Sequence, residues 1–554
     1  MRLSRPSNRA RRDCSAASRK STTRRSLWIA SHSRTACHVS LAPASKPEPR
    51  SSLASEATVA SRIATFLWLA GLLGIATGLR VWCSRGELWL DEVWTWDISK
   101  KLTWPGGLFY QLQEENNHYL NTLVIWLFRD SSKSAGFPYR LPAIVCGIAT
   151  VGVAWRLGRT SPKFRESASW LAGALTATSY LMVHYSSEAR GYAYAVFFAA
   201  LAFDQLWVLE SVRVNPPASG PASRPWRIAS WLFPVACCGG FLSQPIFLTC
   251  FGAMAVWVFL RLKRQGPNEL PWPTLRRYFV LPGLFFVALY LIDLRHAVNG
   301  GGDRFPLWRV VLETLSLAGG GPFSGWAAAV VAVLVAGAFV HGLRVLAREG
   351  DDRWVFHLLV VVVMPLGLLV VLRRAEVYPR YFLIAVFFLI QAGAVGLADL
   401  LQKGTAAWVV ATVSLVGVMG GNGQHIAELA ERGRGNYLPI LRFLSNQEPT
   451  PVIHIRSDHD FRHLLMFKYF LPLADMPGKS LDYVELERVP AEGTEWLLTH
   501  SLDFDWRPPA SRTVRGVEYD LRLFRPYAGL SGWGLALYRR PEGRAVEGAG
   551  QSSK

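Results

Sequence analysis

The sequence has few charged residues and no recognisable cysteine pattern. Only 18% of its 554 residues are Asp, Glu, Lys or Arg, whereas 51% are hydrophobic; soluble domains have about 25% charged residues. None of the seven cysteines has metal-ligand spacing, and the region after residue 422 has none, so no disulfide framework is expected there. There is also no phosphate-binding glycine loop, G-x-S-x-G motif or zinc-ligand pattern. These absences argue against an ordinary soluble protein and against the common nucleotide- and ester-hydrolysing enzymes.

The net charge of +20 is not gathered in a way that suits nucleic-acid binding. Residues 1–60 contain 12 Lys or Arg and 3 Asp or Glu, and much of the remaining positive charge falls in short loops between apolar segments. Cytoplasmic loops of membrane proteins have this bias. The charge therefore indicates membrane topology, and membrane lipids rather than nucleic acid are the expected partners.

Residues 1–60 are rich in Arg, Ser, Ala and Pro and show no sustained periodicity. We predict a disordered basic cytoplasmic tail, or residues upstream of the true start codon. An Arg- and Ser-rich, acid-poor start is also typical of an organellar transit peptide, which remains an alternative.

Apolar segments of bilayer length follow. We predict eleven transmembrane helices, at about 63–83, 140–156, 168–185, 190–210, 228–241, 244–261, 278–293, 324–344, 354–372, 380–401 and 405–421. The short segment 118–129 is predicted to lie in the membrane interface. With it excluded, three basic loops share the side of the N-terminus: Arg156, Arg159, Lys163 and Arg165; Arg213, Arg224 and Arg227; and Arg261, Lys263, Arg264, Arg276 and Arg277. The N-terminus is then cytoplasmic and the C-terminus outside.

The pattern changes after residue 422. Residues 451–455, 495–499 and 533–538 are typical of strands, and 437–444 and 461–471 of helices. The predicted fold class is a polytopic α-helical membrane protein with a small C-terminal α/β extracytoplasmic domain. Its parts are a tail (1–60), a transmembrane domain (61–422) and a periplasmic domain (423–554).

On this topology the polar residues at helix ends converge on the outer face. They are Asp91, Glu92, Glu114, Glu115, His118, Glu188, Arg190, Gln244, Arg295, Asp303, Arg304, Arg373, Arg374, Glu376 and Arg380. Asp91 and Glu92 lie among tryptophans just beyond the first apolar segment, where two adjacent carboxylates are costly to desolvate. A chemical task at the outer membrane surface is therefore more plausible for this pair than packing alone.

Five motifs carry a family resemblance. Leu88-Trp89-Leu90-Asp91-Glu92 resembles the hydrophobic-W-x-D-E motif in the first outer loop of GT-C glycosyltransferases. The branch is the family 39-like one related to protein O-mannosyltransferases and the lipid A aminoarabinose transferase. In matching order follow 116–120 (N-N-H-Y-L), 139–142 (Y-R-L-P), 185–193 (Y-S-S-E-A-R-G-Y-A) and 380–382 (R-Y-F). The chain departs from the family at Tyr119 and Gly191, which replace prolines, and at Ser243-Gln244-Pro245, where relatives often have Thr-His-Tyr.

The resemblance implies an inverting transfer of a sugar from a polyprenyl-phosphate donor to a hydroxyl acceptor, with Asp91 as general base. Glu92 would orient the acceptor or hold a divalent cation, and no ligand set defines a metal. Phosphate needs cations, so Arg190 and Arg380 are predicted to bind it, together with His118 and Glu188 as substrate contacts. The alternatives are interfacial anchors for the arginines, a surface histidine, a simple Glu188–Arg190 pair, and two solvated acids without a task.

Two other functions remain open at this stage. A polytopic transporter or lipid flippase usually has ionisable residues near the bilayer midplane, often within internal repeats. Here only Asp204 and Asp293 interrupt the helix interiors, and no repeat is visible. A sugar- or lipid-binding scaffold without activity is the third reading. The expected location is the cell inner membrane, and the donor sugar and the acceptor (protein, lipid or glycan) are undefined.

Overall fold

The computed structural model describes residues 50–541 except 115, 130–135, 162, 216–223, 266–269, 299–303, 373–376, 489, 491–492 and 527–528. Side chains are described from residue 61 onward, except at 371–372. Most of the predicted tail, residues 1–49, therefore lies outside the described residues. The chain divides between Ser61 and Arg62, and everything from Arg62 onward belongs to one compact unit.

Within the described residues, helices occupy all eleven predicted membrane segments, and eight spans are long and apolar enough to cross a membrane. These eight involve α1 (Arg50–Cys83), α4 (Phe137–Gly158), α7 (Tyr192–Val214), α10 (Trp272–Ile292), α12 (Gly325–Arg348), the series α13 (Arg353–Leu358), η4 (Leu359–Val363) and α14 (Met364–Leu372), then α15 (Leu383–Leu400) and α16 (Thr405–Arg432). The chain is an integral membrane protein of the predicted class.

The other three predicted spans are either broken or shortened by charged residues. Segment 168–185 is divided into α5 (Arg165–Thr178) and α6 (Tyr180–Ser186), because Ser179 is extended and caps α6. The helices α8 (Arg224–Ser243) and α9 (Phe247–Gln265) carry basic residues in an end turn, which shortens their uncharged stretch. Eleven crossings therefore stay a prediction, as does the orientation of the two termini.

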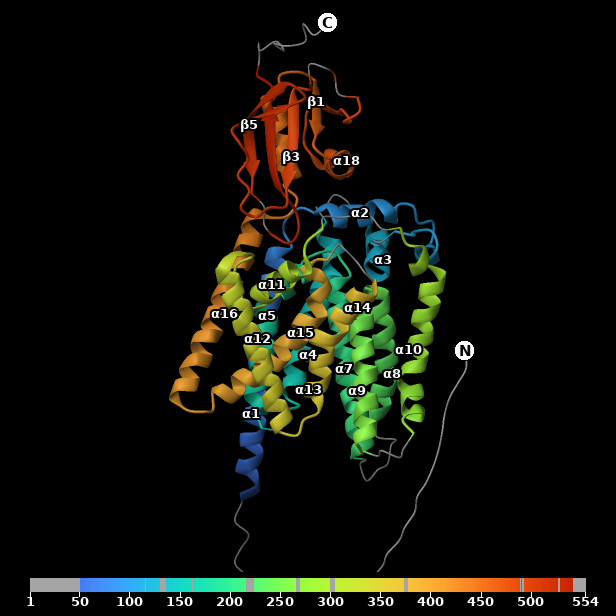
Figure 1. Ribbon diagram of the computed structural model, residues 1–554, viewed down its shortest axis with the longest axis vertical. Helices are drawn as coiled ribbons and strands as arrows, with labels where there is room; N and C mark the ends of the chain where they lie inside the picture. The colour runs from blue at the N-terminus through green and yellow to red at the C-terminus, as the bar shows by residue number, and fades with distance from the viewer. Residues whose placement is uncertain are drawn as a thin grey trace, which may run out of the picture. The chain divides into compact units, whose positions relative to one another are not determined.

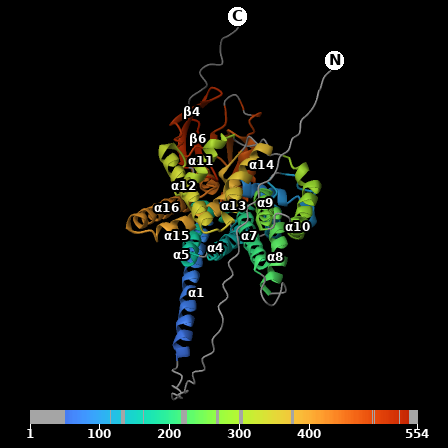
Figure 2. The same cartoon turned by 60° about the horizontal axis from the view of Figure 1, so that its bottom comes forward.

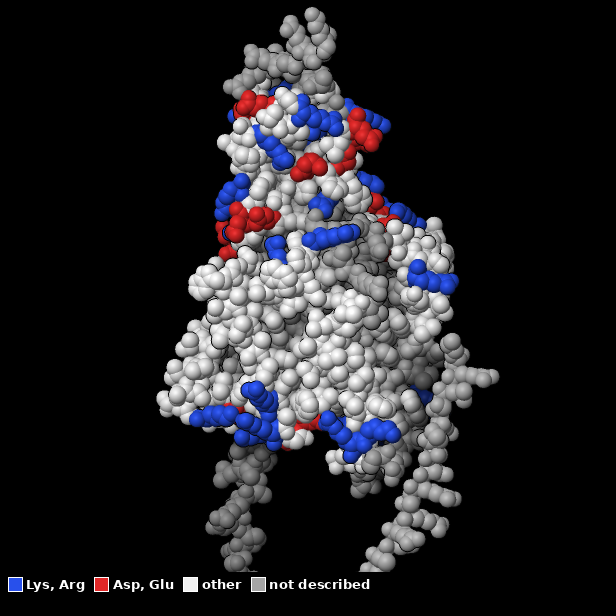
Figure 3. Space-filling model, in the orientation of Figure 1, with Lys and Arg blue, Asp and Glu red and all other residues white. Residues whose placement is uncertain are grey.

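The helices pack around α15, whose residues from Leu383 to Ile390 are all buried. In Figures 1 and 2, α12 and α16 lie to one side and α8, α9 and α10 to the other, with α4 and α7 between them; Figure 1 also shows α15 in this middle position. On the face drawn in Figure 3, a band across this bundle is almost free of charged side chains, with Lys and Arg at the end away from the sheet. Such a belt is what a bilayer requires of a spanning helical bundle.

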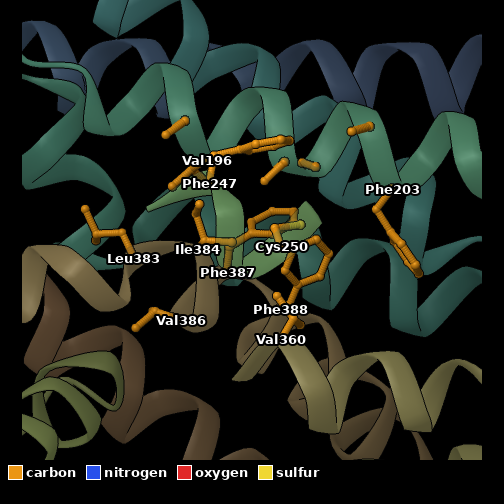
Figure 4. Close-up of a cluster of buried hydrophobic side chains, with 14 of the residues drawn as sticks. Val196, Phe203, Phe247, Cys250, Val360, Leu383, Ile384, Val386, Phe387 and Phe388 are labelled. Atoms are coloured by element: carbon orange, nitrogen blue, oxygen red, sulfur yellow. The ribbon is translucent and has the colours of Figure 1, made fainter. Parts of the chain in front are cut away.

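An aromatic core joins α15 to α7 (Figure 4). The ring of Phe203 stacks on Phe356 at a centroid distance of 3.7 Å and meets the edge of Phe388 at 5.5 Å. In lipid, helix association depends on such close packing because water supplies no driving force between helices. This core fixes the relative positions of α7 and α15, each of which follows an arginine of the predicted site.

The C-terminal region contains a six-stranded sheet of order β2-β1-β3-β6-β5-β4. Its strands are β1 (Val452–Ser457), β2 (Ser480–Tyr483), β3 (Trp496–Ser501), β4 (Ser511–Val514), β5 (Val517–Arg525) and β6 (Gly534–Arg539). The β1–β2 and β1–β3 pairs are parallel and the others antiparallel. The helices α17 (Tyr437–Gln447) and α18 (Asp460–Phe470) pack with the sheet in one core. The three predicted strands and two predicted helices are confirmed, whereas β2, β4 and β5 were not predicted.

Short helices surround the end of the bundle that faces this domain. They are α2 (Leu90–Ser99), η1 (Pro105–Phe109), α3 (Tyr119–Phe128), η3 (Leu294–His296), α11 (Leu307–Ala318) and η5 (Pro379–Phe382), while η6 (Leu471–Leu473) follows α18. The apolar helix α3 matches the predicted interfacial segment. The packing of α2 against α18 joins the two domains. The predicted domain boundary at residue 422 falls inside α16, which continues to Arg432 before the chain turns at Gly433 with φ 69°.

Candidate functional site

Asp91 and Arg190 form a direct ion pair. Asp91 lies in the first turn of α2, and Arg190 lies in the short turn between α6 and α7. Its Nη1 contacts Oδ2 of Asp91, and Nη1 of Arg380 lies 3.5 Å from the same oxygen. Three of the predicted site residues, from separate parts of the chain, therefore meet at one end of the bundle.

His118 holds the other side of the Arg190 guanidinium. Nη2 of Arg190 lies 2.9 Å from Nε2 of His118, and because arginine only donates, this nitrogen must accept. Burial, followed by the charges of Arg190 and Arg380, lowers the pKa of His118 well below its usual range, so the ring is neutral. The guanidinium carbon also lies 5.8 Å and 5.3 Å from the rings of Trp89 and Tyr192.

Gly191 allows this arrangement to form. A Cβ at this position would lie 2.1 Å from the carbonyl oxygen of Ser243 and 3.1 Å from Cβ of His118. The turn between α8 and α9 therefore closes directly on the backbone next to Arg190. Tyr119, which stands where the family has proline, also makes a specific contact: its hydroxyl donates to Oδ2 of Asp293 at 2.5 Å.

Glu92 is separated from Asp91 and held by Arg140. Nε and Nη2 of Arg140 donate to its two carboxylate oxygens at 2.8 and 2.6 Å, and both side chains are 0% exposed. The backbone N–H groups of Ala189 and Trp89 donate to the same oxygens at 2.6 and 3.1 Å. Arg140 also donates to the carbonyls of Ser84, Gly86 and Glu87. Both oxygens of Glu92 therefore already accept hydrogen bonds from protein groups, and its predicted contact with the acceptor or a cation stays a prediction.

Glu188 belongs to a second buried cluster, which joins the bundle to the C-terminal domain. Its Oε1 accepts from Ser531, lies 3.0 Å from Nε2 of His184 and lies 3.3 Å from Nε of Arg434. Burial alone would raise the pKa of this carboxyl, but His184, Arg434 and Ser531 outweigh burial and hold the pKa below its usual value. The predicted alternative, a Glu188–Arg190 pair, does not form, and Glu188 instead holds Arg434.

A cavity of about 700 Å³ lies between the bundle and the C-terminal domain. Asp91 and Arg380 line its bundle side, and α11 adds Arg309 and Glu313. From the C-terminal domain come His459, Phe461, Arg462, Asp503, Phe504, Asp505 and Trp533. Burial raises the pKa of Glu313 to about 7, although Arg309 opposes this. The cavity is thus an aromatic-lined space in which several carboxylates, Asp91 and Glu313 among them, stand beside several cations.

Sequence reasoning did not assign roles to Arg140, Arg434 or the cavity residues of the C-terminal domain. Arg140 stands in the Y-R-L-P motif, which was the available signal for it, whereas nothing near Arg434 marks it as a partner of Glu188. Among the other polar residues expected at the outer face, Glu114 binds Lys101 at 2.6 Å and accepts from Trp94 at 2.8 Å. Glu115, Asp303, Arg373, Arg374 and Glu376 lie outside the described residues.

Glu92, the residue predicted to orient the acceptor or hold a divalent cation, has both oxygens in hydrogen bonds with Arg140 and two backbone N–H groups. Within the described residues, a group of ligand-type side chains occurs instead in the C-terminal domain, at Asp458, His463 and His500.

No protein-family model and no curated protein sequence matches this chain. Among solved structures, ArnT from Cupriavidus metallidurans in the apo state is 12% identical over 79% of this chain and 93% of its own, with a TM-score of 0.48. ArnT from the same organism bound to undecaprenyl phosphate is 13% identical over 78% of this chain and 92% of its own, with a TM-score of 0.46. A third structure is the archaeal oligosaccharyltransferase AglB from Archaeoglobus fulgidus in complex with an inhibitory peptide and a dolichol-phosphate. It is 10% identical over 78% of this chain and 69% of its own, with a TM-score of 0.46.

Proposed function

We propose that this protein transfers a sugar from a polyprenyl-phosphate donor to a hydroxyl acceptor, at the membrane surface that carries the C-terminal domain. The supporting observation is the group of Asp91, Arg190 and Arg380 beside the cavity. With His118 neutral, one carboxylate and two guanidinium groups leave a local charge of about +1, which a phosphodiester monoanion would neutralise. The motif order and the position of the group at the ends of membrane helices favour a lipid-linked donor.

In the proposed reaction, the donor phosphate takes over the guanidinium groups of Arg190 and Arg380. Arginine offers a forked pair of donors that suits phosphate oxygens. Asp91 is then released from its ion pair and becomes available to the acceptor. The position of the Arg190 guanidinium over the rings of Trp89 and Tyr192, and its contact with His118, keep it in place during this exchange.

The chemical step forms a bond between the acceptor oxygen and the anomeric carbon while the bond from that carbon to the phosphate oxygen breaks. The acceptor proton passes to Asp91, and the electron pair of the broken bond stays on the departing polyprenyl phosphate. The two arginines stabilise the negative charge that develops there. Attack from the side opposite the phosphate inverts the anomeric centre, as the resemblance implies.

Glu92 and Arg140 support this site indirectly. Their pair fixes the first turn of α2 against α4, and the bond from Ala189 N–H to Glu92 fixes the segment that carries Arg190. Asp91 and Arg190 are therefore both positioned by one buried carboxylate.

The transporter alternative predicts ionisable groups available near the bilayer midplane. The two acids that the sequence analysis assigned to helix interiors have partners instead: Asp204, in α7, lies 2.9 Å from Arg156, and Asp293, which directly follows α10, accepts from Tyr119. This pairing favours the transferase proposal.

The test uses the purified full chain in lipid nanodiscs, incubated with a panel of polyprenyl-phosphate sugars and hydroxyl acceptors. Release of free polyprenyl phosphate, followed by mass spectrometry, is expected with at least one donor. Absence of release across donors, acceptors and divalent metals, together with lipid translocation in reconstituted vesicles, would establish the transporter reading. Binding of a donor without release or translocation would point to the inactive scaffold.

A further inference from the structure

Asp458, His463 and His500 direct three ligand-type atoms toward one point. Nε2 of His463 lies 3.4 Å from Nδ1 of His500 and 3.2 Å from Oδ1 of Asp458, and Nδ1 of His500 lies 2.8 Å from that oxygen. Ligand atoms around a tetrahedral zinc ion, with bonds of about 2.0–2.1 Å, are roughly 3.3–3.4 Å apart. Two of the three separations already match this spacing, and the third requires a small opening.

Neighbouring groups orient the three side chains. The hydroxyl of Tyr437 lies 2.8 Å from Nδ1 of His463, which turns Nε2 of that ring toward the cluster. The backbone N–H of His500 donates to Oδ2 of Asp458 at 2.9 Å, which leaves Oδ1 facing the two rings. Metal-binding histidines and carboxylates are usually held by such additional hydrogen bonds.

The three residues lie at the joint of β1, α18 and β3. Asp458 follows β1, His463 is in the first turns of α18 and His500 is in β3. The side chain of His463 is 0% exposed and that of His500 is 11% exposed, whereas Asp458 is 25% exposed. The positions are thus fixed by regular structure and are open to solvent on the carboxylate side.

We propose that this cluster binds one divalent ion of the zinc class, with Nε2 of His463, Nδ1 of His500 and Oδ1 of Asp458 as ligands. Two imidazoles and one carboxylate suit Zn²⁺ or Co²⁺, whereas Mg²⁺ and Ca²⁺ prefer oxygen ligands. Three protein ligands leave the fourth position of a tetrahedral ion for water or another small ligand. The site is separate from Asp91 and does not depend on the proposed transfer reaction.

Arg462 competes with the metal for His500. Its Nη1 lies 2.6 Å from Nε2 of His500, and because arginine can only donate, Nδ1 of the ring carries the proton in this state. A metal ion on Nδ1 of His500 displaces that proton, and the neutral ring then carries its proton on Nε2. A protonated Nε2 cannot accept from Arg462, so the hydrogen bond between them is lost. Metal binding and the Arg462–His500 hydrogen bond therefore exclude each other. Because Arg462 lines the cavity and its guanidinium lies 5.6 Å from Trp533, the ion would also alter the cavity wall.

The experiment is a zinc titration of the purified full chain after removal of bound metal with a chelator, monitored by calorimetry and by competition with a chromophoric chelator. We expect one equivalent to bind per chain. His463→Gln, His500→Gln and Asp458→Asn should each weaken binding by more than roughly 100-fold, and Tyr437→Phe by about 10- to 100-fold. Arg462→Ala should strengthen binding severalfold, an effect that simple loss of folding does not produce.

His454→Gln is the matched control, because His454 and Asp482 form an exposed pair at 2.9 Å in the same domain. Its zinc affinity should equal that of the original chain. Substitution of Co²⁺ should give the visible spectrum of a four-coordinate site with nitrogen and oxygen ligands, without thiolate bands. If the original chain binds no zinc, or if the His463 and His500 variants bind it as well as the His454 variant, the proposal is overturned and the cluster is a hydrogen-bonded structural unit.

Discussion

Arg140 donates hydrogen bonds to both carboxylate oxygens of Glu92, at 2.8 and 2.6 Å, and neither side chain is exposed to solvent. Removing one member of such a pair leaves an unpaired buried charge, which typically destabilises a protein by about 3–5 kcal/mol. We therefore expect Glu92→Gln and Arg140→Gln each to lower the midpoint of thermal unfolding in detergent. The exposed pair Arg159–Glu166, at 3.5 Å, supplies the control, and Glu166→Gln should have little effect. Loss of transfer by Glu92→Gln at unchanged stability would instead support a direct catalytic role for Glu92.

Glu188 and Arg434 connect the bundle to the chain that enters the C-terminal domain. Because both side chains are only 1% exposed, we expect Arg434→Gln to loosen this connection. Hydrogen exchange in α17 should become faster, by roughly 10-fold or more. Lys468→Ala is the matched control, since it breaks a solvent-exposed pair with Asp97 at 2.6 Å between the same two domains. Equal exchange in both variants would show that Glu188 does not secure the joint.

Gly191 leaves room for the carbonyl of Ser243 beside the site. A methyl group there would meet that oxygen at 2.1 Å, so the turn between α8 and α9 or the segment with Arg190 must move. Because small displacements of positioned groups lower rates steeply, we expect Gly191→Ala to lower kcat/KM by roughly 10- to 100-fold. Gly152→Ala, with no atom within 4 Å of the new Cβ, should leave it unchanged. An unaffected Gly191→Ala enzyme would mean that this contact does not hold Arg190.

We expect binding of the proposed donor to depend on pH through Glu313. Burial raises the pKa of its carboxyl to about 7, so the group is neutral below that pH and negative above it. A negative charge on the cavity wall repels the phosphate of the donor, so KM for the donor should rise about 3- to 10-fold between pH 6 and pH 8. Glu313→Gln should flatten this dependence, whereas Glu428→Gln, at another cavity acid, should retain it because Glu313 is still present. A profile unchanged by Glu313→Gln would assign the pH effect to another group.

The sequence predicted the general architecture because bilayer length, apolar runs and basic loops are local properties of the chain. It also predicted that Asp91, Arg190, His118 and Arg380 belong together, since each stands at a helix end on one face of the membrane. The number of crossings was less secure because basic end turns and the break at Ser179 depend on the context of neighbouring helices. The strands β2 and β4 have only four residues each, and they form through pairing with β1 and β5. The nine-residue strand β5 alternates apolar and polar residues from Val517 to Leu523, a pattern that the sequence analysis did not use.

The contacts that Glu92 and Glu188 make could not be predicted from the sequence. Adjacent residues on a helix point about 100° apart, so Asp91 and Glu92 separate as soon as α2 forms. Sequence analysis did not predict α2, and therefore treated the two acids as one group. The partners of Glu188, Arg434 and Ser531, lie 246 and 343 residues further along the chain. No local pattern encodes such a long-range partner.

The central claim is that Asp91 removes the acceptor proton while Arg190 and Arg380 hold the donor phosphate. The most direct measurement compares Asp91→Asn with the original chain in single-turnover transfer and in donor binding, once a donor has been found. We expect the transfer rate to fall by about 100- to 10,000-fold, because general base catalysis contributes that much. Donor binding should be retained or tighter, because the arginines lose their competing carboxylate. Transfer at an undiminished rate by Asp91→Asn would contradict the account.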